Sequence, residues 1–112
     1  MQIKIHRGVD QIGGCITEIK SKKARILIDV GTNLPNTESK VKVNVSNISK
    51  KCDAVFITHY HLDHIGEYMK VKKKIPIYIG EQAKDIFMIY QNRMKEPKIS
   101  QVTQEHVDRL KI

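Results

Sequence analysis

A short apolar run at residues 54–58 (sequence AVFIT) ends abruptly in a polar cluster at residues 59–64. The run is too short for a helix, and its composition is typical of a buried strand. The cluster places three imidazoles and one carboxylate within six positions, which an ordinary surface loop rarely does. We therefore predict a buried strand with a chemically specialised loop at its C-terminal end.

The first 30 residues favour three further strands. Apolar side chains recur at every second position over 2–6 and 15–19, which is the period of half-buried strands. Gly13 and Gly14 separate these two segments, and Lys22 and Lys23 make a polar turn before the next. Residues 24–30 are more continuously apolar and suit a central strand. Together these segments predict an antiparallel meander.

The remaining segments predict a layered α/β fold. We expect a loop at 31–39, a helix at 65–71, a strand at 75–79 and a helix at 80–94. Residues 41–45 allow either a short edge strand or a loop leading into a helix at 46–51. A last helix is expected around Val102, His106, Val107 and Leu110, opened by Ser100 or Thr103. The fold class is therefore α/β (α+β layered), a mixed sheet covered by helices.

Length and composition set the outer bounds of this fold. A chain of 112 residues with 40% hydrophobic residues fits one small domain. No apolar run approaches the roughly 20 residues of a membrane-spanning helix, and the first residues lack the core of a secretory signal. We expect a soluble cytoplasmic protein with no membrane partner. Cys15 and Cys52 stand far apart, and we expect reduced, partly buried thiols.

The charge balance points to polyanions. Twenty Lys and Arg against twelve Asp and Glu give a net charge of +8, which attracts RNA or DNA. Nucleic acid is therefore a candidate partner. The simpler interpretation is that the lysine runs near residues 20–25 and 70–74 are solvated faces that keep the protein soluble.

The polar cluster is best explained by a metal site. In an extended chain His59, His61 and Asp63 point the same way, and a turn after Asp63 brings His64 alongside. Imidazole nitrogen and carboxylate oxygen suit Zn²⁺ and also Fe or Mn. The other two histidines, His6 and His106, lack partners in sequence and are expected to be structural or surface residues.

At this point the sequence resembles a known superfamily. Residues 58–64 (THYHLDH) match the signature of metallo-β-lactamase-fold hydrolases, an HxHxDH motif after an apolar strand. Residues 26–31 (ILIDVG) look like the earlier strand-plus-Asp-Gly element of that superfamily, and 11–14 (QIGG) resemble its opening glycine turn. The opening residues 6–8 (HRG), together with residues 11–14, look similar to the sequences of the superfamily branch near ribonuclease J.

The resemblance implies roles for the clustered residues. His59 and His61 would bind a first ion, and Asp63 and His64 a second, with two zinc ions expected and manganese or iron as alternatives. Asp29 and Thr58 would stand behind these ligands and hold the histidine loop in shape, although Asp29 also suits a simple turn before Gly31. The implied reaction is attack of a metal-bound hydroxide on a phosphodiester of RNA or DNA, with Asp63 as the catalytic carboxylate that orients the hydroxide.

The resemblance covers only the N-terminal half of the αββα sandwich. A complete site of this family also needs a third histidine for the first metal, a bridging aspartate and a further histidine, and none is recognisable here. We therefore expect residues 1–112 to be a truncated metallo-β-lactamase-like domain. Its unpaired edges and missing ligands predict a homodimer or another chain that completes the site.

Two alternative functions stay open on the sequence. The histidine motif is shared with glyoxalase-like enzymes, so a small-molecule thioester or lactone hydrolase fits it as well. The missing ligands instead favour a catalytically incomplete fragment that acts as a basic binding module.

Overall fold

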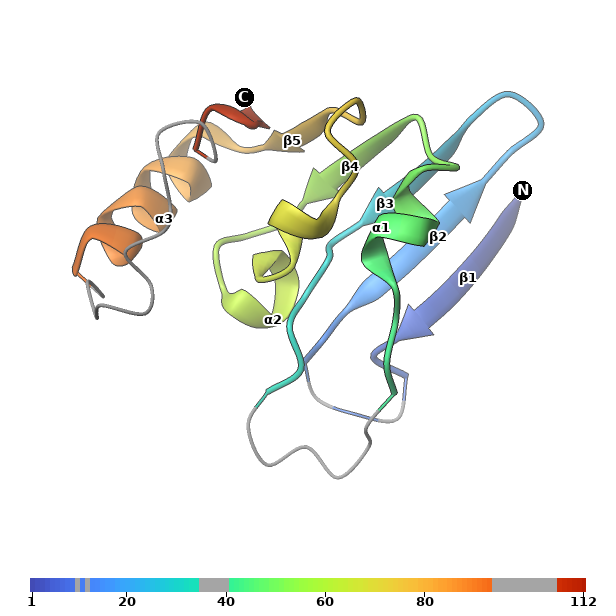
Figure 1. Ribbon diagram of the computed structural model, residues 1–112, viewed down its shortest axis with the longest axis horizontal. Coiled ribbons are helices and arrows are strands. Elements are labelled where there is room, and N and C mark those ends of the chain that lie inside the picture. The colour runs from blue at the N-terminus through green and yellow to red at the C-terminus, as the bar shows by residue number, and fades with distance from the viewer. Residues whose placement is uncertain (10, 12, 35–40, 94–106) are drawn as a thin grey trace.

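The computed structural model describes residues 1–9, 11, 13–34, 41–93 and 107–112. Within them one sheet has six strands in the order β1-β2-β3-β4-β5-β6, so strands that are consecutive in sequence are also neighbours in space. The helices α1 and α2 lie in front of this sheet, and α3 lies beside β5 (Figure 1). This arrangement confirms the predicted α/β class and the mixed sheet.

The N-terminal part of the sheet is the predicted meander. Strands β1 (Gln2–Arg7), β2 (Ile16–Lys20) and β3 (Arg25–Ile28) pair antiparallel. The turn between β2 and β3 is closed by Ser21, whose backbone N–H donates to the carbonyl of Ala24 at 2.8 Å. Alternation of apolar and polar residues thus correctly predicts that the first two of these segments are strands.

The C-terminal part of the sheet is parallel. Strand β4 (Ala54–Ile57) pairs with β3, followed by β5 (Ile77–Ile79) and β6 (Leu110–Lys111). The crossovers contain α1 (Val45–Ser49), then α2 (Leu62–Ile65) with the 3-10 helix η1 (Tyr68–Lys70), then α3 (Glu81–Arg93). Parallel crossovers are almost always right-handed, so a strand order that advances in one direction places successive helices on the same face of the sheet.

The core lies between the sheet and these helices. Four residues in register on adjacent strands, Leu27, Val55, Ile77 and Leu110, are completely buried. Phe87 of α3 is also buried, and its ring packs edge-on against the ring of Tyr68 at 5.7 Å. This contact places α3 against η1.

The opposite face of the sheet carries exposed apolar side chains. Ile3 is 65% exposed, Ile5 49% and Phe56 42%, and none of these is on the face that holds the buried core. The rings of Phe56 and Tyr78 stack with centroids 5.4 Å apart. Parallel strands are usually buried on both faces. This face is therefore an apolar surface that no helix of the described ranges covers.

Three expectations need correction or completion. The helix expected at 65–71 begins earlier, at Leu62, and continues as η1. Residues 41–44 are a loop leading into α1, so the second of the two alternatives holds, and Asn44 caps α1 by accepting from the N–H of Asn47. Leu110 lies in β6 and not in a helix, because pairing with β5 satisfies backbone groups that an open edge would leave exposed.

Some expectations lie outside the described residues. These are the rest of the last predicted helix, including Val102 and His106, and the second half of the loop at 31–39. In the described ranges, no helix combines the length and apolarity that spanning a bilayer requires.

Both cysteines carry free thiols, as expected. Burial raises the pKa of Cys52 to about 11. The pKa of Cys15 is also raised, first by burial and then by the negative charges of Asp29 and Asp63. Both groups therefore remain protonated at neutral pH and are poor nucleophiles and ligands there.

Candidate metal centre

The histidine cluster lies where two parallel strands end. Residues 58–61 connect β4 to α2, and Asp29 directly follows β3, which pairs with β4 in parallel. Carboxyl ends of parallel strands meet at one edge of a sheet. The fold therefore brings Asp29 to the histidine loop across 30 residues of sequence.

Asp29 holds this loop with its carboxylate. It is only 4% exposed, Oδ1 accepts from the backbone N–H of Thr58 at 2.8 Å, and Oδ2 accepts from Thr58 Oγ1 at 2.8 Å and His64 Nδ1 at 2.7 Å. Its φ of 62° is in the left-handed region, which Asp tolerates better than most residues. Asp29 thus both turns the chain before Gly31 and binds the loop.

These hydrogen bonds fix where the imidazole protons are. Thr58 Oγ1 has one hydrogen and donates it to Asp29, so it accepts from His59 Nδ1 at 2.9 Å. His64 Nδ1 likewise donates to the Asp29 carboxylate. In the neutral rings each Nδ1 then holds the proton, and each Nε2 keeps a free lone pair. His59 and His64 are therefore both prepared to bind a cation through Nε2.

The potential ligands are close to one another. The ring centroids of His59 and His64 are 4.0 Å apart and those of His59 and His61 are 4.9 Å apart. Asp63 Oδ2 lies 3.5 Å from His64 Nε2. Burial, and then the nearness of His64 and His61, lowers the pKa of His59. This keeps the ring of His59 neutral at neutral pH, the form that binds metals.

The backbone clamps α2 against the strand ends. The N–H groups of Val30 and Thr32 donate to the carbonyls of His64 and Leu62 at 2.8 and 2.9 Å. A Cβ on Gly31 would overlap the carbonyl oxygen of Asp63, so only glycine fits this approach. This close packing favours the short helix α2 at residues for which the sequence suggested an extended chain.

The expectation that Asp63 continues an extended alternation is therefore wrong. His61 is the N-cap of α2, and both Asp63 and His64 lie within that helix. The backbone bonds from the strand ends favour a helical turn over an extended segment at this point. Asp63 and His64 still lie beside His59, but by way of the helical turn.

The donor atoms of these residues suit a metal ion, but their side chains are not arranged as a complete site. Imidazole Nε2 atoms and a carboxylate are the donors that Zn²⁺, Mn²⁺ and Fe²⁺ accept. Throughout the described part of the chain, no three His, Cys, Asp or Glu side chains converge closely enough to hold an ion. Binding by His59, His61, Asp63 and His64 therefore requires a change of rotamer or donors from elsewhere.

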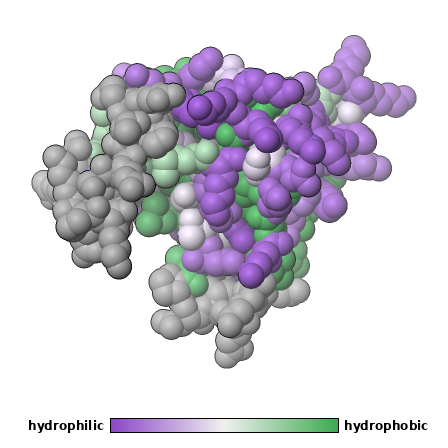
Figure 2. Space-filling view, viewed as in Figure 1, coloured by the Kyte–Doolittle hydropathy of each residue, from purple (hydrophilic) through white to green (hydrophobic). Residues whose placement is uncertain are grey.

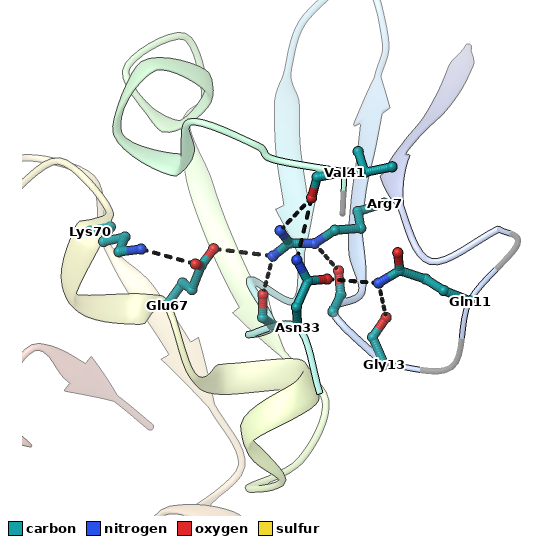
Figure 3. A network of polar contacts seen from close by, with 9 residues as sticks. Arg7, Gln11, Gly13, Asn33, Val41, Glu67 and Lys70 are labelled. Carbon is teal, nitrogen blue, oxygen red and sulfur yellow. Dashed lines mark hydrogen bonds and ion pairs between the residues drawn. The ribbon is translucent and has the colours of Figure 1, made fainter. Parts of the chain in front are cut away.

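A buried arginine, which the sequence did not indicate, supports the site from behind. Arg7 donates from Nε to the carbonyl of Gly14 at 2.8 Å, from Nη1 to that of Val41 at 3.1 Å and from Nη2 to that of Gly31. Nη2 also pairs with Glu67 Oε2 at 3.2 Å (Figure 3). One guanidinium thus ties the glycine turn and the loop after β3 to the end of α2.

A strand irregularity explains why the sequence pattern did not predict a buried position for Arg7. Simple alternation along 2–6 places residue 7 on the apolar face away from the helices. A bulge between Ile5 and Arg7 shifts the register so that Arg7 lies opposite Ile16, on the helix-covered face. Neither composition nor periodicity signals this shift.

His6 stays outside the site, as expected. Its Nε2 lies 3.1 Å from Glu18 Oε1, which makes it a partner of a cross-strand carboxylate. His106 is outside the described residues.

Replacing Asp29 with Asn is expected to weaken zinc binding by about 10- to 100-fold, because the amide cannot accept all three hydrogen bonds. Asn also tolerates the left-handed backbone, so the change is confined to the side chain. Affinity would be measured by competition with a fluorescent zinc chelator. The matched control is Asp53→Asn, because Asp53 accepts a hydrogen bond from Arg25 N–H beyond the other end of β4. Equal affinities for both variants would contradict this role of Asp29.

The sequence is similar to those of known proteins. The family model of the metallo-beta-lactamase superfamily matches residues 14–109. An "RNase J-like protein" of Methanocaldococcus jannaschii is 37% identical over 89 residues, covering 78% of this chain and 19% of that protein. A "Probable RNase MJ4" of the same organism is 30% identical over 92 residues, covering 80% and 21%. The chain therefore spans about a fifth of the length of these curated relatives.

A solved structure supports the fold. A protein of unknown function from Enterococcus faecalis V583 superposes with a TM-score of 0.62 at 21% identity, over 81% of this chain and 28% of that one. The sequence resemblance is confirmed in both its superfamily and its ribonuclease J-like branch. This chain belongs to the metallo-beta-lactamase superfamily.

Proposed function

We propose that this chain provides the first metal ligands of a hydrolase that cleaves phosphodiester bonds in RNA. The observation that carries the proposal is the hydrogen-bond chain through Asp29 and Thr58, which leaves Nε2 of both His59 and His64 free. His64 Nε2 also lies 3.5 Å from Asp63 Oδ2, a contact with a second potential ligand that a histidine serving only as a core residue does not need.

Each ligand has a separate part in this proposal. His59 and His61 would hold one ion, and Asp63 and His64 a second, with zinc as the first expectation and manganese or iron as alternatives. When bound, such ions supply a hydroxide nucleophile at neutral pH and polarise a phosphoryl oxygen. The Asp63 carboxylate, which faces His64, would orient the attacking group, and Asp29 would keep the imidazoles aligned.

The substrate class rests on two kinds of support. The two curated relatives are named as an RNase J-like protein and a probable RNase. The chain also has a net charge of +8, which suits a polyanion. Because the chain spans about a fifth of those relatives, the remaining ligands would come from additional sequence, a second copy or a partner chain.

One observation favours a second candidate, a basic binding module that does not catalyse. Within the described residues no three donors converge as a complete metal site would require. A thioester or lactone hydrolase remains a third candidate, because the same motif serves those reactions.

A cleavage assay tests the proposal directly. Single-stranded RNA with a 5′ fluorescent label is incubated with protein supplied with zinc or manganese, and fragments are resolved by electrophoresis. We expect cleavage that EDTA abolishes and that Asp63→Asn slows about 100-fold. Asp85→Asn, an acid exposed on α3, is the matched control and should cleave like the parent. Intact RNA with both metals, when the sequence or chain that supplies the remaining ligands is present, contradicts the proposal, and cleavage of a thioester instead supports the third candidate.

A further inference from the structure

A polar cleft lies between α1 and the antiparallel strands, away from the histidine loop. It has a volume of about 400 Å³, and its lining includes Lys4 of β1, Arg25 of β3, and Asn47 and Lys51 in and after α1. Figure 2 shows hydrophilic side chains spread over this part of the face, across α1 and β1–β3. Nothing in the proposed reaction uses these residues.

The cations in this cleft are only partly neutralised. Among the described residues that line the cleft, the one carboxylate is Glu18, which pairs with His6 at 3.1 Å and with Arg25 Nε at 3.7 Å. In the part of the chain that the structure describes, the ammonium groups of Lys4 and Lys51 have neither a hydrogen-bond nor an ion-pair partner. The cleft therefore has a net positive charge and free donors, which suit an anion with several oxygens.

The positive surface continues beyond the cleft. A second hollow of about 400 Å³ shares Asn44 with the first and is lined by Lys42 and Lys70. Lys42 likewise has no partner among the residues described, whereas Lys70 pairs with Glu67 at 2.9 Å. Two adjoining basic hollows around α1 fit a chain of phosphates better than a single small anion.

The cleft also has a defined position relative to the histidine loop. Arg25 begins β3, whereas Asp29, just past the end of β3, contacts the loop. At about 3.3 Å per residue in a strand, these two positions are separated by about 13 Å. An extended nucleic-acid strand can therefore reach both places.

We propose that the cleft of Lys4, Arg25 and Lys51 binds backbone phosphates of single-stranded RNA outside the proposed reaction site. The inference rests on the proposed RNA substrate, but it concerns binding alone and can be measured without cleavage. Phosphate contacts of this type are independent of base sequence and weaken with salt.

The test compares two double variants with the same change in charge. Lys4→Gln/Lys51→Gln removes both unpaired cations of the cleft. Lys73→Gln/Lys74→Gln removes two exposed lysines before β5 and is the matched control. Binding of a fluorescent 12-nucleotide oligouridylate is measured by anisotropy at several salt concentrations, with EDTA present to prevent hydrolysis.

We expect the cleft variant to lose at least tenfold in affinity at low salt. The slope of log affinity against log salt should fall by about 1.4, which corresponds to two phosphate contacts on a single strand. The control should stay within about threefold of the parent. Thermal melting by circular dichroism verifies that both variants are folded.

Two results would overturn the inference. One is an equal loss of RNA affinity in both variants, which would indicate that the overall positive charge of the chain binds RNA. The other is no loss of RNA affinity in the cleft variant. If inorganic pyrophosphate binding then still depends on Lys4 and Lys51, the ligand of the cleft is a free anion. Failure of the proposed hydrolysis looks different, because RNA would remain bound through the cleft but uncleaved.

Discussion

Alanine at both His59 and His61 is expected to lower the zinc content of the purified protein from near one ion per chain to below about one tenth. The two imidazoles are the donors proposed for the first ion, and a single carboxylate with one histidine holds zinc weakly. Metal would be measured by mass spectrometry of elements after dialysis against metal-free buffer. RNA cleavage, where the parent shows it, should be lost in parallel.

The control for this prediction is His6→Ala. His6 also lies close to a carboxylate, at 3.1 Å, but on a strand away from the loop. It should leave the metal content unchanged. Zinc that persists in the double variant would show that these two histidines do not bind it. A folded parent protein that is free of zinc after the same dialysis would show that this loop alone does not hold a cofactor.

Replacing Arg7 with Met is expected to destabilise the fold by about 3–5 kcal/mol, because Glu67 Oε2 and the backbone carbonyls that the buried guanidinium binds lose their donor, although Glu67 keeps its pair with Lys70. The guanidinium side chain is 3% exposed and that of Glu67 13%, so solvent cannot readily replace the lost contacts. The carbonyls of Gly14 and Gly31 would lose their donors as well. Urea denaturation followed by circular dichroism measures the change.

Arg25→Met is the matched control for this substitution. Arg25 also pairs with a glutamate, but its side chain is 25% exposed and the distance to Glu18 is 3.7 Å. Partly exposed pairs typically contribute less than about 1 kcal/mol. If both variants lose a similar free energy of unfolding, the network around Arg7 does not stabilise the fold more than a partly exposed ion pair does.

Most of the sheet could be predicted from the sequence. Strict alternation in β1 and β2 and a compact apolar run in β4 each have one good explanation, since helices need apolar residues three or four positions apart. The helix over residues 81–93 follows from the same reasoning. In these segments local pattern and tertiary packing favour the same conformation.

The parts that could not be predicted depend on contacts between distant segments. Strand β6 has two residues and gains its conformation from pairing with β5. Helix α2 begins inside the histidine motif because backbone groups of residues 30 and 32 bind its carbonyls. Arg7 faces the core because a bulge reverses the alternation. None of these contacts can be predicted from the local composition of the sequence.

The candidate site shows the same division. The motif at 59–64 identifies the residues that gather, and the resemblance identifies Asp29 as a residue that stands behind them. The sequence could not indicate that the Thr58 hydroxyl donates its hydrogen bond to Asp29 and therefore accepts one from His59, which places the proton of the His59 ring on Nδ1. That arrangement depends on the relative position of β3 and β4.

The position of Asp29 on a different strand from the histidines has a thermodynamic consequence. The ligand loop is aligned only when β3 and β4 are paired, because the aligning carboxylate follows β3. Cation binding and the pairing of these two strands are therefore linked equilibria, and each must strengthen the other by the same free energy. A substitution anywhere along the β3–β4 ladder that weakens pairing would be felt as weaker cation binding, with every ligand still in place.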